Sequence, residues 1–219
     1  MGGCCEPSGY DDLFGARFSR HLAKRYRRRG LDRTASRIVE FLAAQGVEGA
    51  TVLEIGGGVG DLHLELLRRG AARATNLELV DSYEDDAAAL ATEAGVADRV
   101  TRRRLDLVTD PDAVEPHDIV VLHRVVCCYP DHQRLLGAAA RHATRLLVFS
   151  HPPRNAVSRL LFAAENLGFR IRRIAFRTYL HDPGALTVSA EQGRLRATFR
   201  HRGLTWHVVG LTDPVRAAV

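Results

Sequence analysis

The segment from Val52 to Leu67, VLEIGGGVGDLHLELL, constrains the fold of this 219-residue chain more than any other. It begins with an apolar run typical of a buried strand, continues through a glycine-rich turn, and passes directly into leucines at helical spacing. A strand, a glycine turn and a helix in this order are typical of the first unit of a nucleotide-binding α/β sheet. The sequence therefore predicts a ligand site at this turn.

The glycines of the turn narrow the kind of ligand. Gly56, Gly58 and Gly60 can adopt positive φ angles, and they let the backbone approach a ligand without interference from a Cβ atom. The dinucleotide-binding fingerprint requires a further glycine three positions after Gly58, where this chain has Asp61. The segment is instead an acid, Glu54, followed by G-x-G-x-G.

The rest of the chain alternates strand-like and helix-like segments. Two helices, 10–29 and 32–45, precede the first strand at 51–55, and the glycine turn leads into a third helix. Further strands are predicted at 74–79, 100–107, 118–122 and 145–150, with helices at 83–94, 155–167 and 183–192. Two final strands, 195–202 and 206–211, flank Gly203 as an antiparallel hairpin. The predicted fold is α/β: a Rossmann-like doubly wound sheet, mostly parallel, with an antiparallel C-terminal hairpin and an N-terminal helical extension.

Length and composition agree with one folded core. A chain of 24.1 kDa with 46% hydrophobic and 26% charged residues is ordinary for a soluble protein. We expect residues 1–35 to form an arm and helix that act as a lid, and residues 36–219 to form the ligand-binding domain. No apolar run is long enough to span a bilayer, and the N-terminus lacks the profile of a secretion signal, so a cytoplasmic location is expected.

The net charge of +5 comes almost entirely from arginine. The densest cluster, Arg25 and Arg27 to Arg29, lies at the end of the first expected helix. It suits phosphate binding, but a solvated basic helix end that interacts with the helix dipole is the favoured interpretation. Nucleic acid is therefore not expected as a partner.

Two carboxylates stand where strands are expected to end. Glu78 closes the second strand, where a carboxylate can accept hydrogen bonds from both ribose hydroxyls. Asp106 closes the third, where it can accept from the exocyclic amine of adenine. The alternatives are a surface acid for Glu78 and a cap or turn acid for Asp106, which is followed closely by Asp110 and Asp112.

Histidines and cysteines follow the next strands. His123 and His151 stand at the ends of the fourth and fifth strands, where either can serve as a general base or as a structural histidine. The cysteines form two adjacent pairs, Cys4-Cys5 and Cys127-Cys128. Adjacent cysteines in an extended segment point in opposite directions, so free thiols that are buried or line the substrate site are expected, and no metal. A thiolate-rich metal site that includes His123 or His151 is the alternative.

These residues together resemble the class I S-adenosylmethionine-dependent methyltransferases. The resemblance covers residues 33–211 and rests on VLEIGGGVG, Glu78, Asp106, DIVVLHRV at the fourth strand and the final hairpin. It implies that Glu54 and the turn glycines (Gly56, Gly57, Gly58 and Gly60) hold the methionine end of the cofactor and that Glu78 holds the ribose. It further implies that Leu79, Asp106 and Leu107 hold the adenine and that His123 lies beside the sulfonium.

More loosely, the chain is similar to small-molecule O-methyltransferases of the magnesium-protoporphyrin type. It lacks the N-P-P-Y motif that protein- and nucleic-acid-methylating members carry after the fourth strand. The resemblance implies methyl transfer from S-adenosylmethionine to an oxygen or nitrogen of a small molecule. A nicotinamide-dependent oxidoreductase and a non-catalytic nucleotide- or RNA-binding module are the alternatives, and the acceptor and oligomeric state stay open.

Overall fold

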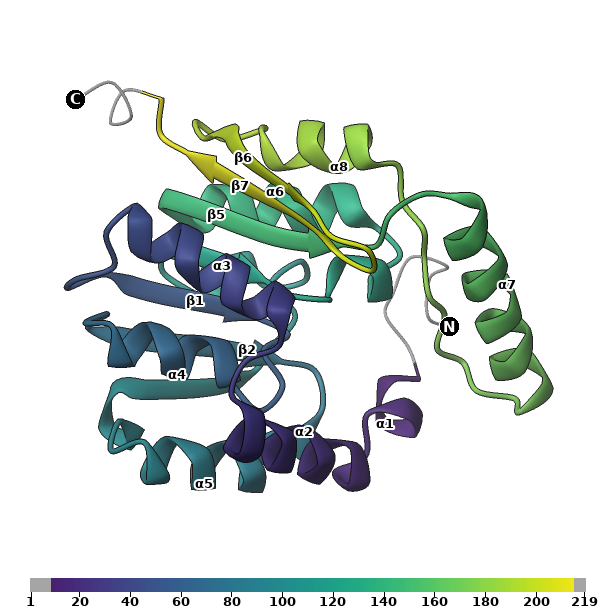
Figure 1. The fold of residues 1–219 in the computed structure, drawn as a ribbon, viewed down its shortest axis with the longest axis horizontal. Helices are drawn as coiled ribbons and strands as arrows, with labels where there is room; N and C mark the ends of the chain where they lie inside the picture. The colour runs from purple at the N-terminus through teal and green to yellow at the C-terminus, as the bar shows by residue number, and fades with distance from the viewer. Residues whose placement is uncertain (1–8, 215–219) are drawn as a thin grey trace.

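Seven strands form one sheet in the computed structural model, which describes residues 9–214 (Figure 1). The strands are β1 (Thr51–Ile55), β2 (Arg73–Glu78), β3 (Val100–Arg104), β4 (His117–Leu122), β5 (Ala143–His151), β6 (Arg196–Arg202) and β7 (His207–Thr212). Their order in the sheet is β3-β2-β1-β4-β5-β7-β6. The first five strands are parallel, and β7 lies between β5 and β6 and runs antiparallel to both. The predicted fold class is confirmed.

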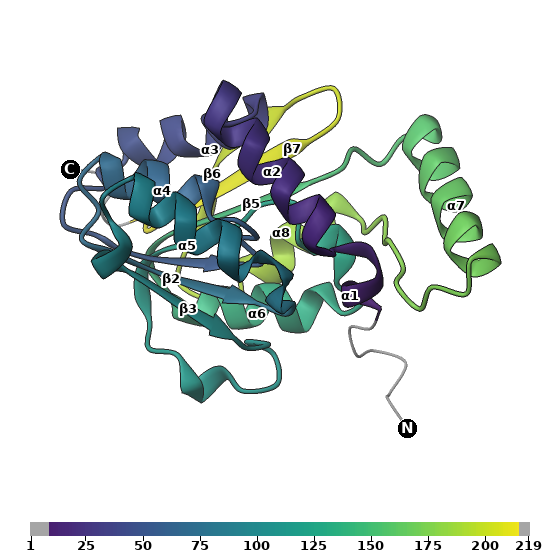
Figure 2. The same ribbon diagram turned by 90° about the horizontal axis from the view of Figure 1, so that it is seen from below.

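Helices cover both faces of the sheet. They are α1 (Tyr10–Leu13), α2 (Ala16–Arg29), α3 (Arg33–Ala44), α4 (Asp61–Arg68), α5 (Glu84–Glu93), α6 (His132–His142), α7 (Ala156–Ile171) and α8 (Pro183–Ala190). Helices α2 to α5 share one hydrophobic core with the sheet, and α6 and α8 share a second core on the other face. Both views show α7 standing clear of these layers (Figures 1 and 2).

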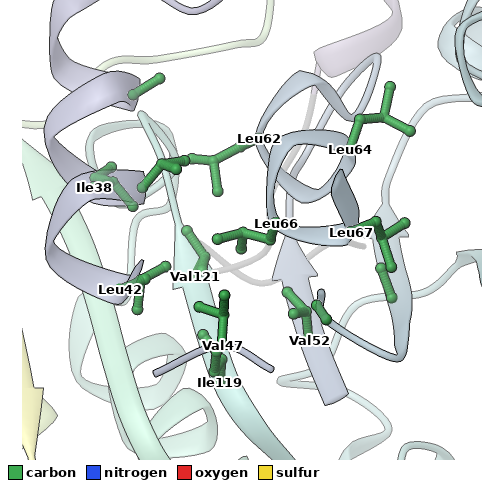
Figure 3. Packing of buried hydrophobic residues seen from close by; sticks show 14 of the residues in the cluster. Ile38, Leu42, Val47, Val52, Leu62, Leu64, Leu66, Leu67, Ile119 and Val121 are labelled. Carbon is green, nitrogen blue, oxygen red and sulfur yellow. The ribbon is translucent and has the colours of Figure 1, made fainter. Parts of the chain in front are cut away.

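Strand alternation supplies both cores. Val52 of β1 and Val121 of β4 face the core under α3 and α4, whereas their neighbours Leu53 and Val120 face the core under α6. Figure 3 shows the first core, where leucines of α4 and apolar residues of α3 meet the side chains of β4. Continuous apolar strands are thus buried on both sides, and polar side chains are left for the strand ends.

Four local predictions differ from the structure. The helix expected over 10–29 is broken between α1 and α2, because Gly15 has extended backbone. Gly168 lies inside α7 instead of ending it, because the helical spacing of apolar residues continues to Ile171. Helix α6 was not predicted, although Asp131 caps its first turn through the Arg134 amide. Strand β3 ends at Arg104, so Asp106 lies in the turn that follows it.

Candidate functional site

A cavity of about 550 Å³ lies at the edge of the sheet where the parallel strands end. This volume falls within the range of small-molecule sites, roughly 300–1,000 Å³. Its wall is formed by the turn after β1, the segments after β2, β3 and β4, the N-terminal helices α1 and α2, and one side of α7. Eight of the residues predicted from the sequence line it: Gly56, Gly57, Gly58, Glu78, Leu79, Asp106, Leu107 and His123.

The glycine turn has no room for a side chain at Gly56 or Gly57. Gly56 has φ of 64°, and a Cβ atom there would lie 2.6 Å from Val125. Gly57 has no room either, because its Cβ would lie 2.6 Å from the Glu54 carboxyl carbon. The guanidinium of Arg102 donates to the Gly58 carbonyl at 3.0 Å. The turn therefore presents bare backbone to the cavity in a fixed shape.

Glu78 is hydrogen-bonded directly to the backbone of the glycine turn. It is 9% exposed, and its two oxygens accept from the backbone amides of Gly58 and Leu79, each at 2.8 Å. Burial raises the pKa of Glu78, whereas the two amides act in the opposite direction. Because a carboxylate oxygen has more than one lone pair, both oxygens can still accept from a ligand. This arrangement suits the expected ribose contact.

Asp106 is fixed at the other side of the cavity. One carboxylate oxygen accepts from the Tyr129 hydroxyl at 2.9 Å, and the other accepts from the Val108 amide at 2.9 Å. The turn role that the sequence left open is therefore real, and the same carboxylate also lines the cavity beside Leu79 and Leu107.

Glu54 and Gly60 are not cavity residues. Glu54 is 2% exposed, and one of its carboxylate oxygens accepts from both His63 Nδ1 at 2.6 Å and the His63 amide at 3.2 Å. Gly60, with φ of 82°, caps the start of α4 against the same imidazole. Both residues support the turn from behind, and neither lines the cavity.

The two candidate histidines lie in different surroundings. His123 lines the cavity, with its Nδ1 3.0 Å from the Ser150 hydroxyl and its Nε2 3.7 Å from Asp32. His151 is buried outside the cavity, where its Nδ1 donates to the Pro152 carbonyl at 2.9 Å and burial lowers its pKa. Of the two histidines, only His123 therefore lines the cavity.

Sequence reasoning missed a cluster of charged residues on the cavity wall: Arg25, Asp32, Asp61 and Arg124. Arg124 has a left-handed backbone, φ 61°, which is uncommon outside glycine. Its guanidinium lies 2.8 Å from Asp32 and 5.2 Å from the centre of the Trp206 ring. The signal was available, since Arg124 directly follows His123 at the end of β4.

The pKa values of the two acids in this cluster move apart. Burial by itself would raise the pKa of Asp32, but His123, the Ala35 amide and Arg124 together hold it well below its usual range. Burial raises the pKa of Asp61 to about 6, helped by the charge of Glu54. Opposite shifts of this kind are typical of functional sites.

Arg25 corrects the interpretation of the arginine cluster as one solvated helix end. Arg27 pairs with Glu93 at 2.7 Å and Arg28 is exposed, as expected of a surface. Arg25 instead lines the cavity, within 4 Å of both Asp32 and Asp61. The signal was helical spacing, because Phe18, Leu22 and Arg25 lie on one side of α2.

Cys127 and Cys128 both line the cavity as free thiols. They lie in a short 3₁₀ turn (Val126–Cys128), not in an extended segment, so their sulfur atoms are 3.7 Å apart instead of pointing in opposite directions. Within residues 9–214, no group of three histidine, cysteine or acidic side chains could hold a metal ion. Cys4 and Cys5 lie outside the described residues. Among the helices described, none has the length and apolar character needed to cross a membrane.

Comparison with known proteins decides the class of protein. Residues 24–206 match a family profile described as a methyltransferase domain. This chain belongs to that methyltransferase family. The resemblance seen in the sequence is thereby confirmed, the protein is an enzyme, and S-adenosylmethionine is its methyl donor. A search of curated proteins by sequence gave no match.

Solved structures with the same fold include three methyltransferases. Magnesium protoporphyrin IX methyltransferase from Synechocystis PCC 6803, with bound SAH, has a TM-score of 0.70 at 18% identity, over 93% of this chain and 99% of that one. An O-methyltransferase family 2 protein from Planctomyces limnophilus, in complex with apigenin, has a TM-score of 0.66 at 20% identity. The match covers 89% of this chain and 61% of that one. Geranyl diphosphate C-methyltransferase from Streptomyces coelicolor has a TM-score of 0.63 at 15% identity. The match covers 81% of this chain and 79% of that one. At these low identities, the comparisons show that this chain shares the fold of the three enzymes.

Proposed function

We propose that this methyltransferase transfers a methyl group from S-adenosylmethionine to an oxygen or nitrogen of a small, largely apolar molecule. The observation that carries the proposal is Glu78, a buried carboxylate bonded to the glycine turn and facing the cavity. A ribose with two adjacent hydroxyls matches its two oxygens. Asp106 and Leu107 would then lie at the adenine.

The charged cluster fits the amino-acid end of the cofactor, which carries one ammonium and one carboxylate. Arg25 offers a positive charge and Asp61 a negative one, and both line the cavity beside the glycine turn. Glu54 is already bonded to His63, so we assign this end to Arg25, Asp61 and the turn backbone instead. The whole cofactor would thus be held along the ends of β1, β2 and β3.

The remaining wall suits an apolar acceptor. Aromatic side chains from four segments surround this part of the cavity: Tyr10, Phe14, Phe18, Phe162 and Phe176. Two of the solved relatives are named for magnesium protoporphyrin IX or contain apigenin, which are flat conjugated molecules. An aromatic acceptor with a hydroxyl or carboxyl group is the class that we propose.

The chemistry needs little from the protein beyond alignment and proton removal. When bound, the cofactor supplies an activated methyl group. The cavity walls orient the acceptor, and orientation alone can contribute roughly 7–11 kcal/mol. His123, held through Nδ1 by Ser150, is the group placed to accept the proton of the acceptor.

The N-terminal segment covers this site. Tyr10 of α1 donates to the Cys128 carbonyl at 2.6 Å, and α2 places Phe18 and Leu22 on the cavity. We propose that the start of this segment opens to admit the acceptor and then excludes water from the closed site.

Calorimetric binding of S-adenosylhomocysteine tests the proposed cofactor site. Glu78→Ala should weaken binding by at least ~10-fold, since hydrogen bonds to a charged group contribute roughly 1.5–3 kcal/mol. Glu115→Ala, which removes an exposed acid, is the matched control and should bind like the wild type. Absence of binding to the wild type would refute the proposed function at its base.

Testing His123 requires an acceptor, which a thermal-shift screen of hydroxylated and carboxylated aromatic compounds can supply in the presence of S-adenosylhomocysteine. With that acceptor, His123→Gln should lower kcat by roughly 10²–10⁴-fold. The dissociation constant of the cofactor should change little. If the kcat of His123→Gln equals that of the wild type at every pH tested, His123 is excluded as the base.

A further inference from the structure

Helix α7 exposes a continuous apolar stripe. Five large side chains along it are 58% to 74% exposed: Val157, Leu160, Leu161, Leu167 and Ile171. Their spacing of three and four residues places them on one side of the helix. A patch of this kind on a monomer marks an interaction surface.

The opposite side of α7 already has its partners. Ser158 and Phe169 are buried, and Phe162 lines the cavity. Asn166 exchanges hydrogen bonds with the backbone of Thr178 at 2.8 and 2.9 Å. The exposed stripe is therefore a second apolar face on a helix that is held in place and stands clear of the sheet layers (Figures 1 and 2).

Exposed positive charge lies along one flank of the stripe and at the end of the helix. Arg159, Arg170, Arg172 and Arg173 are exposed on α7 and at its end. Within residues 9–214, none of these four guanidinium groups forms an ion pair. The one acidic residue of the helix, Glu165, lies on the cavity side, where it accepts from the Thr178 hydroxyl at 3.0 Å. The exposed surface of α7 thus carries an apolar stripe with arginines on one flank and at its end.

The positive charge on α7 distinguishes between the possible partners of the apolar stripe. A second copy of the chain, packed through the same stripe, would bring a helix with the same exposed arginines, whose one acidic residue, Glu165, lies on the cavity side. An anionic lipid surface offers negative headgroups to the arginines and an acyl boundary to the leucines. We propose that α7 docks on an anionic membrane surface, lying in the plane of the interface without crossing the bilayer. Because Phe162 faces inward from the same helix, docking brings the cavity next to the lipid.

Flotation with vesicles of phosphatidylcholine, with and without phosphatidylserine, tests this proposal on the full chain. We expect binding only to the vesicles with phosphatidylserine. Leu160→Gln/Leu161→Gln should weaken it by about 10-fold or more, because two leucines leave the acyl boundary. The control is Val188→Gln/Leu204→Gln, which removes two apolar side chains that are 68% and 98% exposed elsewhere on the molecule. It should bind like the wild type.

A second pair of variants tests the charge. Arg159→Gln/Arg170→Gln should weaken binding and reduce its dependence on salt, whereas Arg28→Gln/Arg29→Gln, an exposed pair on α2, should not. Circular dichroism and binding of S-adenosylhomocysteine show that each variant is folded. These readouts need no acceptor, so failure of this proposal leaves the proposed function unaffected.

Three outcomes would overturn the proposal. The first is no binding to either kind of vesicle. The second is equal loss of binding in the α7 variants and their controls, which would mean general attraction of a basic protein. The third is a dimer in sedimentation velocity that Leu160→Gln/Leu161→Gln dissociates without any effect on vesicles, which would make the stripe an interface between copies of the chain.

Discussion

At the scale of single residues, the composition of the site depends on which charged side chains point into the cavity. Arg25 and Arg28 are neighbours in one basic cluster, yet only Arg25 lines the cavity. Glu54 and Glu78 both stand on strands beside the glycine turn, yet of the two only Glu78 lines the cavity. Residue type therefore identifies candidates, and the direction of each side chain selects among them.

Arg25→Gln should weaken binding of S-adenosylhomocysteine by roughly 10- to 100-fold, because a charge-assisted contact to the carboxylate of the ligand is lost. Arg28→Gln removes an exposed arginine from the same helix and should leave affinity unchanged. Isothermal titration of the two variants in parallel is the measurement. Equal affinities would place the carboxylate of the ligand elsewhere in the cavity.

Asp61 makes the free enzyme less stable as pH rises. Its pKa in the folded protein is about 6 against 3.8 unfolded, so the folded state binds more protons between these values. The free energy of unfolding therefore falls as pH rises through this window, by up to about 3 kcal/mol. Partial exposure of Asp61 reduces this figure.

Asp61→Asn removes this penalty. Urea unfolding should show the variant more stable than the wild type at pH 8, with the difference vanishing near pH 4. A constant difference at all pH values would mean that the substitution acts through packing and not through the charge. With S-adenosylhomocysteine present, the order should reverse if Asp61 binds its ammonium group.

At the scale of elements, the turn after β1 and helix α7 use glycine in opposite ways. Gly56 has a positive φ and would clash with Val125 if it carried a side chain. Gly168 lies in a helix with no neighbour within 4 Å of a Cβ atom. The sequence predicted the turn at Gly56 correctly but took Gly168 as the end of a helix, because a single glycine does not report its backbone angles.

Gly168→Ala should stabilise the protein by about 0.5–1 kcal/mol, since alanine is the better residue in a helix interior and meets no steric obstacle here. Thermal unfolding measures the change, and Gly56→Ala is the informative contrast. That variant should lose stability and cofactor binding together, through backbone strain and contact with Val125. Destabilisation by Gly168→Ala would mean that α7 is distorted at this residue.

At the scale of the whole molecule, the N-terminal segment is part of the core as well as a cover. Ala23, Tyr26 and Ala35 are buried in the same cluster as α3 and α4. The boundary expected at residue 35 falls inside α3, which begins at Arg33. We therefore limit the proposed lid to the residues before α2, up to the break near Gly15.

Truncation tests where the moving part ends. Removal of residues 1–14 should leave the melting temperature within a few degrees of that of the full chain. Removal of residues 1–35 should lower it by at least about 10 °C, because loss of a buried aromatic such as Tyr26 costs roughly 3–5 kcal/mol. Differential scanning calorimetry measures both. A folded enzyme with unchanged stability after the longer truncation would show that this segment is a separate unit.

The sequence by itself determined the fold class, the glycine turn and the presence of Glu78 and Asp106 near it, because these depend on local patterns. Apolar strands buried on both faces, and glycine where positive φ is required, are properties of a few neighbouring residues. The class of enzyme followed from their succession along the chain.

The tertiary structure alone decided which charged groups share the cavity. Arg25 and Asp32 are far from Trp206 along the chain, and the three meet only because α2 and the β6–β7 turn fold over the end of β4. It also decided that Glu54 faces His63 and that His151 is buried away from the site. These outcomes depend on long-range packing, since the direction of a side chain is fixed by whatever element lies opposite it.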